Sequence, residues 1–207
     1  MIRGVLFDLG GVVLDSPLHA IARFEAEQGI PAGFVNRVVV EAGPGGAWSR
    51  LERGELSLEA FFEAFSGECA AAGQPLPARL LMERIGEASA PRPLMLEAVA
   101  RIRARGLRAG ALTNNWPCPG EEDGTRALRD HFDAFVESCR LGMRKPDPRI
   151  YRHACRELGV APGEAAFLDD IGRNLKPARE LGMATIRVAE PQGALEELEV
   201  LLGFPLR

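Results

Sequence analysis

Three features are scarce in this chain, and each scarcity removes a class of protein. No apolar run approaches the roughly 20 residues of a membrane-spanning helix, so no membrane protein is expected. Basic residues are not in excess, because 25 Lys and Arg stand against 29 Asp and Glu and the two signs are interleaved. A nucleic-acid-binding face is therefore not expected either. The cysteines are few and far apart, with no Cys-x-x-Cys pair: Cys69, Cys118, Cys139 and Cys155.

Such cysteine spacing argues against a disulfide framework or a zinc site and favours reduced thiols. Residues 1–15 enter a strand-like pattern at once, without a secretory leader, so we expect a cytoplasmic location. At 207 residues and 46% apolar content, the chain is long enough for one large core, or for a core with a smaller companion.

Short apolar runs alternate with helical patterns along most of the chain. The runs cover residues 2–9, 107–112, 165–168 and 184–188, and helical patterns at 93–104, 147–158 and 175–181 precede the last three. This alternation predicts an α/β fold with a doubly wound parallel sheet. A polar, turn-rich loop is expected at residues 117–124.

Residues 16–90 follow a different pattern. Amphipathic stretches such as SLEAFFEAFSGECAAAG and LPARLLMERIGEA occur there without a convincing strand between them. We interpret residues 16–90 as a small helical cap inserted after the first strand, and residues 1–15 and 91–207 as the α/β core.

Polar residues follow the predicted strands at the point where each strand ends. In an open parallel sheet, ligands bind at the carboxyl ends of the strands, so these residues should meet in one crevice. Taken singly, each has an ordinary structural explanation as a turn residue, a helix cap or a solvated lysine. Their joint placement is much harder to obtain by accident. The residues at strand ends are Asp8, Thr113, Asn114, Asp169 and Asp170, and a separate basic segment around Lys145 is counted with them.

The chemistry of this set is coherent. Three acids aimed at one point repel one another unless a cation lies among them. Because the donors are oxygens and no His or Cys is near, the expected ion is Mg²⁺, which commonly shares its shell with a phosphate. Lys145 and the Thr113 hydroxyl then offer charge and a donor to phosphate oxygens, and an aspartate is a competent nucleophile. The expected partner is thus a small phosphate-bearing molecule, with a homodimer left open.

Four motifs in order resemble those of the haloacid dehalogenase superfamily: FDLGG, LTNNW, GMRKPDPRIY and FLDDIGRNLKPARELGM. The likeness covers nearly the whole chain and implies a Rossmann-like core with a helical cap. The chain is most similar to a narrower group, the amino-terminal phosphatase domain of soluble epoxide hydrolases and the phosphatase-like domain fused to some acyl-CoA dehydrogenases. The stretches RLERGELSLEAF, VESCRLGMRKPDPRIY and LEELEVLLGFPLR carry that similarity.

The resemblance implies a role for each residue of the set. It makes the chain a magnesium-dependent phosphatase-like hydrolase that forms an aspartyl-phosphate. Asp8 would be the nucleophile and a metal ligand, Thr113 and Asn114 would bind phosphate, and Lys145 would steady nucleophile and phosphate. Gly10 would offer its carbonyl and Asp170 its carboxylate to the metal, and Asp169 would support the metal through a water. Asn174 would line the same pocket.

Gly10 departs from the pattern of the superfamily. Most of its phosphatases carry a second aspartate there, which protonates the leaving oxygen and activates water. Losing that acid should cost roughly 3–5 kcal/mol of barrier unless another group replaces it. Three explanations stay open: a substrate with a good leaving group, a replacement acid such as Asp15, Glu41 or Glu52, or ligand binding without efficient turnover.

Two further alternatives concern function and substrate. Dehalogenase chemistry also uses an aspartate nucleophile but needs no metal, so the paired Asp169 and Asp170 favour phosphoryl chemistry. The cap sequence leaves the substrate open among sugar, acyl and lipid phosphates, with a lipid-phosphate pocket the minority interpretation. Trp116, beside the second motif, is a candidate for the entrance of the site. Trp48 is a candidate either for packing on a ligand or, at least as readily, for the core of the cap.

Overall fold

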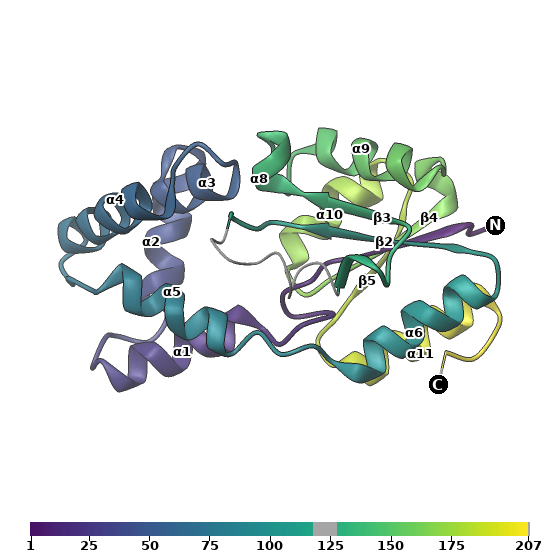
Figure 1. The fold of residues 1–207 in the computed structure, drawn as a ribbon, viewed down its shortest axis with the longest axis horizontal. Helices are drawn as coiled ribbons and strands as arrows, with labels where there is room; N and C mark the ends of the chain where they lie inside the picture. The colour runs from purple at the N-terminus through teal and green to yellow at the C-terminus, as the bar shows by residue number, and fades with distance from the viewer. Residues whose placement is uncertain (118–127, 207) are drawn as a thin grey trace.

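The computed structural model describes residues 1–117 and 128–206, and its centre is a five-stranded parallel sheet (Figure 1). The strand order is β3-β2-β1-β4-β5. The predicted loop at 117–124 lies, apart from Pro117, outside the described residues, as does Cys118. The strands are β1 Gly4–Phe7, β2 Arg108–Thr113, β3 Ala134–Glu137, β4 Ala165–Asp169 and β5 Ala184–Arg187.

The doubly wound parallel sheet predicted from the sequence is confirmed. All four apolar runs coincide with strands. The strand order places β1 at the centre of the sheet, where all four of its residues are buried. Alternate residues of β1 serve different cores: Val5 and Phe7 belong to one hydrophobic cluster and Leu6 to another. Strand β3 was not predicted from the sequence, since AFVE is only four residues long and ends on a charge.

Helices cover both faces of the sheet (Figure 1). Helices α6 (Pro93–Ala104) and α11 (Pro191–Leu202) lie on one face, and α9 (Pro148–Leu158) and α10 (Gly172–Glu180) lie on the other. A short helix, α8 (Ser138–Leu141), follows β3, and a 3-10 turn, η2 (Pro162–Glu164), precedes β4. Both faces are therefore dry, which is the usual environment of a parallel sheet.

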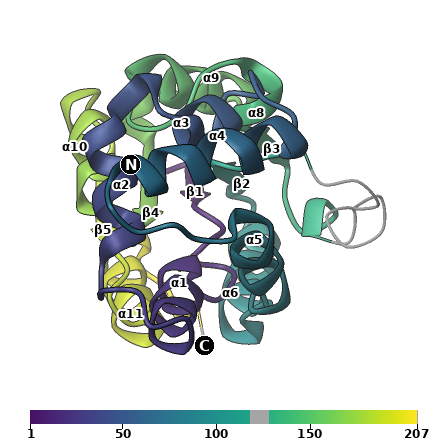
Figure 2. The same ribbon diagram turned by 90° about the vertical axis from the view of Figure 1, so that its left-hand side faces the viewer.

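A second group of helices lies beside the sheet (Figure 1), faces the viewer in Figure 2, and has its own hydrophobic core. Its centre is aromatic, with the rings of Phe61 and Phe65 stacked 5.3 Å apart and Trp48 edge-on to both. Trp48 thus lies in this core, as anticipated. The elements are α1 Pro17–Glu27, α2 Phe34–Ala42, η1 Gly43–Gly45, α3 Ala47–Glu52, α4 Leu58–Ala71 and α5 Ala78–Glu87.

The chain crosses between these two parts twice, side by side. The Asp15 N–H donates to the Ala90 carbonyl at 2.9 Å, and the Arg92 N–H donates to the Val13 carbonyl at 2.8 Å. We therefore propose that residues 16–90 are the cap and residues 1–15 and 91–207 are the core, and we use these two names below.

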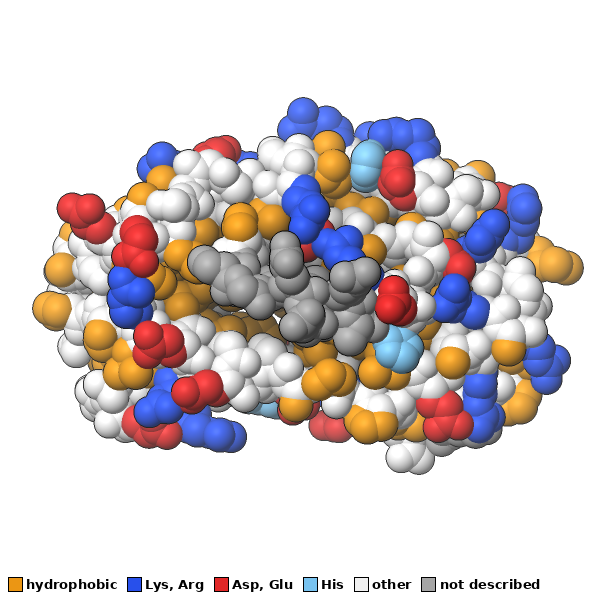
Figure 3. Space-filling model, in the orientation of Figure 1, with side chains coloured by type: hydrophobic (Ala, Val, Ile, Leu, Met, Phe, Trp, Pro, Cys, Tyr) orange, Lys and Arg blue, Asp and Glu red, His pale blue; other side chains and the backbone are white. Residues whose placement is uncertain are grey.

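The surface gives no sign of a single dominant charge on the face shown in Figure 3, where acidic and basic side chains are intermixed. Within the described residues, no helix is long and apolar enough to cross a membrane.

Candidate functional site

Three carboxylates meet at the carboxyl ends of the two central strands. Asp8 directly follows β1, Asp169 ends β4, and Asp170 comes next. Strands β1 and β4 pair in register, with Phe7 opposite Leu168, so the residues that follow them come together. Asp8, Asp169 and Asp170 each offer an oxygen within 4.8 Å of the others. The acids that the strand ends were predicted to bring together therefore lie side by side.

Lys145 is the cation that holds two of these acids. Its Nζ lies 2.7 Å from Oδ1 of Asp8 and 2.7 Å from Oδ2 of Asp169, and its side chain is 1% exposed. Burial opposes the charge of Lys145, but Asp169 and Asp8 outweigh burial and raise its pKa. Lys145 is thus a charged ammonium buried between carboxylates, rather than a solvated surface lysine.

Backbone and side-chain donors fix the orientation of Asp169. Its Oδ1 accepts from the Ile171 N–H at 2.8 Å, and the Asn174 Nδ2 donates to both of its oxygens at 3.0 Å. Tyr151 donates from its hydroxyl to the Asn174 carbonyl at 2.7 Å, which holds the start of α10 against α9. Asn174 therefore reaches the site, as the resemblance implies, by positioning Asp169.

Asp8 and Asp170 each keep an oxygen that no hydrogen bond of the described residues engages. On Asp8, Oδ1 accepts from the Leu9 N–H at 2.8 Å and from Lys145, which leaves Oδ2 open. On Asp170, Oδ1 is buried and has no hydrogen-bond partner in the described part of the chain. A buried acceptor without a partner costs free energy unless a cation or water satisfies it.

These observations fit a divalent cation. Burial raises the pKa of Asp8, and Asp169 and Asp170 add to that rise while Lys145 opposes it. Burial, followed by the charge of Asp169, also raises the pKa of Asp170. A cation among the three would favour their charged forms, and an all-oxygen donor set suits Mg²⁺.

Gly11 makes room for Asp170. The residue has φ +78°, and a Cβ at this position would lie 2.2 Å from Oδ2 of Asp170. Only glycine fits both the backbone conformation and the space.

Gly10 does not adopt a left-handed backbone, so its missing side chain is not explained by conformation. A Cβ on Gly10 would lie 3.1 Å from Cδ of Pro17, the first residue of α1. The place that the side chain of a second acid would take is therefore next to Pro17, the first residue of α1.

The residues after β2 contribute differently from one another. Thr113 is 4% exposed at the end of β2. The Asn114 side chain is occupied by the Lys145 backbone, since its Oδ1 accepts the Lys145 N–H at 2.8 Å and its Nδ2 donates to the Lys145 carbonyl at 3.1 Å. As placed here, Asn114 orients the loop that carries Lys145. The Trp116 ring packs edge-on against the Trp48 ring, with centroids 6.0 Å apart, and so joins the segment after β2 to the cap.

Of the three candidate replacement acids, Glu52 is the one whose side chain is buried. Asp15 is exposed and pairs with Arg92 at 3.2 Å, and Glu41 is exposed on α2. Glu52 is buried, and its Oε2 lies 2.6 Å from Nε of Arg144 and 3.4 Å from Nδ2 of Asn114. Burial raises the pKa of Glu52, with Arg144 the main opposing influence.

Arg144 was missed in the sequence, although it directly precedes Lys145. Its guanidinium pairs with Glu52 and donates to the Ser49 hydroxyl, so it joins the core loop to α3 of the cap. A basic residue beside the predicted lysine was the available signal, but its partners are far away in the sequence.

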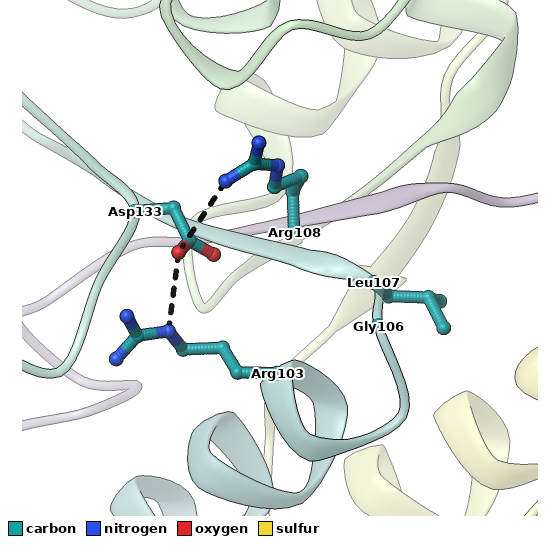
Figure 4. A pocket seen from close by; sticks show the side chains of 5 residues that line it. All are labelled: Arg103, Gly106, Leu107, Arg108 and Asp133. Carbon is teal, nitrogen blue, oxygen red and sulfur yellow. Dashed lines mark hydrogen bonds and ion pairs between the residues drawn. The ribbon is translucent and has the colours of Figure 1, made fainter.

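Another cavity, of about 370 Å³, lies at the opposite ends of the strands (Figure 4). There, Arg103 and Arg108 converge on Asp133, at 3.2 and 3.8 Å. Asp133 also accepts the Ala109 N–H at 2.9 Å, so this cluster ties β2 to the segment before β3.

A family model for haloacid dehalogenase-like hydrolases matches residues 2–182. Because the match covers most of the chain, the protein belongs to this family, and the resemblance drawn from the four motifs is confirmed.

Curated relatives narrow the comparison. The chain is 39% identical over 207 residues to acyl-CoA dehydrogenase family member 10 of Mus musculus, covering 99% of the chain and 19% of that relative. It is 38% identical over 219 residues to bifunctional epoxide hydrolase 2 of Sus scrofa, covering 99% of the chain and 40% of that relative. The chain therefore spans less than half of either relative.

Among solved structures, the fold is similar to that of a haloacid dehalogenase family enzyme of Bacteroides thetaiotaomicron in complex with magnesium and inorganic phosphate. That structure has a TM-score of 0.61 and 20% identity, and the match covers 90% of this chain and 94% of the other.

Proposed function

We propose that this hydrolase is a magnesium-dependent phosphatase-like enzyme that acts on a small organic phosphate through an aspartyl-phosphate at Asp8. The observation that carries this proposal is the cluster of Asp8, Asp169 and Asp170 around the Lys145 ammonium. A related fold that holds magnesium and inorganic phosphate supports it. A cytoplasmic location and a homodimer stay predictions from the sequence.

In the proposed metal site, Asp8 and Asp170 ligate Mg²⁺ through their carboxylates, Gly10 does so through its carbonyl, and Asp169 supports the ion from the outside. The bound ion would neutralise charge on the phosphoryl oxygens. Asp169 is suited to the outer position, because Asn174, Ile171 and Lys145 already occupy its oxygens.

In the proposed reaction, a carboxylate oxygen of Asp8 attacks phosphorus, the bond to the leaving oxygen breaks, and the phosphoryl group is carried on Asp8. Lys145 holds Oδ1 of Asp8 in place and offers positive charge to the transferring group. Thr113 supplies a hydroxyl donor. Water then cleaves the aspartyl-phosphate and releases inorganic phosphate.

The proton for the leaving oxygen has no donor at Gly10. Glu52 is close to the Lys145 loop, but its two oxygens are engaged by the Trp48 Nε1 and by the Arg144 guanidinium, so neither is free to meet a leaving oxygen. We therefore favour substrates with a good leaving group, such as acyl phosphates, sugar-1-phosphates and aryl phosphates, which need little acid assistance.

The test is phosphate release with Mg²⁺ across an aryl phosphate, acetyl phosphate, sugar-1-phosphates and lysophosphatidates. Asp8→Asn is the blank, and Asp170→Ala should weaken the response to Mg²⁺. Turnover confined to good leaving groups supports the proposal as stated, and turnover of alkyl phosphates means that another acid replaces the one missing at Gly10. Equal rates in the protein and in Asp8→Asn would refute the mechanism.

A binding domain without turnover is the second candidate, and Gly10 is the observation that favours it. Mg²⁺ and phosphate binding without phosphate release on any substrate of the panel would establish it. A metal-independent release of halide from a haloacid would instead point to dehalogenase chemistry.

A further inference from the structure

A cavity of about 340 Å³ lies where the cap meets the core, apart from the three carboxylates. One wall comes from the cap, from the end of α2, from η1 and from α3. The other wall comes from the core, from the loop at 144–147 and from Arg173 of α10. Figure 2 shows α2 and α10 on the same side of the molecule. The volume of this cavity is within the range of small-molecule sites.

Three guanidinium groups line this cavity, and the acids around them do not balance all three. Arg144 pairs with Glu52 at 2.6 Å, and Arg53 pairs with Glu55 at 2.5 Å. Arg173 is exposed and has no ion-pair or hydrogen-bond partner within residues 1–117 and 128–206. One positive charge at the cavity is thus left uncompensated.

The single acid among the lining residues does not supply the missing charge. Asp147 accepts from the Arg149 Nη2 at 2.6 Å and also from Nε of Arg149, so this carboxylate is already neutralised outside the cavity.

The neighbouring positive charges change the pKa of Arg144. Burial lowers the pKa of Arg144, Glu52 opposes that change, and Arg173 and Arg53 lower the pKa further by repulsion. A bound anion would relieve this repulsion, since an opposite charge nearby favours the charged form of each arginine.

Four other lining residues are apolar. Val39 and Val40 of α2 lie on the cap side, with Pro44 of η1, and Pro146 lies on the core side. Val40 is 53% exposed, although it is a large aliphatic residue on the surface of a folded chain. An apolar wall facing arginines suits a ligand with an acidic head and a short carbon chain.

We propose that this cavity binds a small amphiphilic anion, a carboxylate or phosphate group on a short carbon chain, with its acidic head on Arg173 and Arg144. This site goes beyond the proposed function and does not require chemistry at Asp8. Because its walls come from both parts of the chain, the bound anion would bridge cap and core. The anion has two sources: the far end of a substrate whose phosphate lies at Asp8, or a separate molecule.

Binding is tested with hexanoate, titrated by calorimetry into the metal-free chain and into Asp8→Asn. Saturable binding is expected in both, and the neutral hexan-1-ol should not bind. Arg173→Gln should weaken hexanoate binding about tenfold, as expected for loss of a charged hydrogen bond. Lys176→Gln is the matched control, because it removes the same charge from the exposed face of the same helix and does not line the cavity.

Absence of saturable binding by hexanoate, or equal affinity in Arg173→Gln and the unmodified chain, would overturn the proposal. Because Asp8→Asn is expected to bind hexanoate normally, a failure of the phosphatase proposal leaves this result unaffected.

Kinetics then separate the two sources. If the far end of the substrate occupies the cavity, Arg173→Gln raises KM for a phosphate ester that carries a carboxylate and leaves KM for its neutral amide unchanged. If the anion is a separate molecule, hexanoate binding is weakened about tenfold in Arg173→Gln while both KM values stay the same. Either result is compatible with the site, and each identifies its ligand.

Discussion

The ammonium of Lys145 lies 2.7 Å from Oδ1 of Asp8 and 2.7 Å from Oδ2 of Asp169, so one buried cation bridges two buried carboxylates at the end of the sheet. Asp170 adds a third carboxylate nearby. The site therefore carries more negative than positive charge in a buried region. Removing its one ammonium group should lower the stability of the folded chain, and adding a metal cation should raise it.

Lys145→Met should destabilise the metal-free protein by about 3–5 kcal/mol, because it leaves Asp8 and Asp169 without their shared partner. Urea unfolding in the presence of a chelator measures this change. Lys176→Met is the control, since Lys176 is exposed and its pairing with Glu180 at 4.0 Å should be worth less than about 1 kcal/mol. Equal effects of the two substitutions would contradict a buried bridging role for Lys145.

Magnesium should stabilise the folded chain. A ligand that binds only the native state adds about 2.7 kcal/mol at a concentration one hundred times its Kd, so Tm should rise as MgCl₂ is added. Asp170→Asn should reduce the rise, because it removes a charged ligand while it preserves shape. Thermal unfolding of both proteins with and without MgCl₂ gives the comparison, and an undiminished rise in Asp170→Asn would show that Asp170 is not a ligand.

Gly10→Asp should restore the missing acid at a cost in packing. The new Cβ would lie 3.1 Å from Cδ of Pro17, so α1 must shift by a few tenths of an ångström. If the proposed reaction holds, hydrolysis of alkyl phosphates should rise by about 10²-fold, and that of aryl phosphates should change little. Adding Pro17→Ala removes the close contact and should increase the gain.

Gly10→Asn is the matched control for this change, since asparagine has nearly the same shape as aspartate but no carboxyl group that could act as an acid. Identical rates in Gly10→Asn and Gly10→Asp would attribute any gain to packing rather than to acid catalysis.

Glu52→Gln should weaken the contact between cap and core. Glu52 is buried against Arg144, and removal of its charge leaves the Arg144 guanidinium unpaired at a cost of about 3 kcal/mol or more. Glu55→Gln is the comparison, because Glu55 is half exposed and its loss should cost less than about 1 kcal/mol. Chemical unfolding measures the stability of the two variants. Similar midpoints would mean that the pair of Glu52 and Arg144 stabilises the folded chain no more than a surface ion pair does.

Much of the fold could be predicted from local patterns. The runs that contain β1, β2, β4 and β5 are apolar and bounded by turn residues, and β1, β2 and β4 are buried at their centres. Strand β3 escaped prediction because a four-residue segment that ends in Glu137 has too little pattern of its own, and its pairing with β2 supplies the rest. The helical cap was recognisable because α4 and α5 carry apolar residues at helical spacing.

The candidate site was predictable for a related reason. Parallel strands that pair in register must end at the same edge of the sheet, so a sequence with acids after two such strands already implies that the acids meet. The order of the motifs along the chain also placed Lys145 with them. These consequences need only local sequence and the geometry of parallel strands.

Tertiary structure alone decided how the cap sits on the core. The pair formed by Glu52 and Arg144, the contact of Gly10 with Pro17, and the meeting of Arg53, Arg144 and Arg173 at one cavity all join the cap to the core or residues far apart in sequence. No local periodicity records such contacts, because they depend on the packing of helices whose own sequences only require an apolar face to be covered. The sequence thus determined the site at the sheet, and packing determined its surroundings.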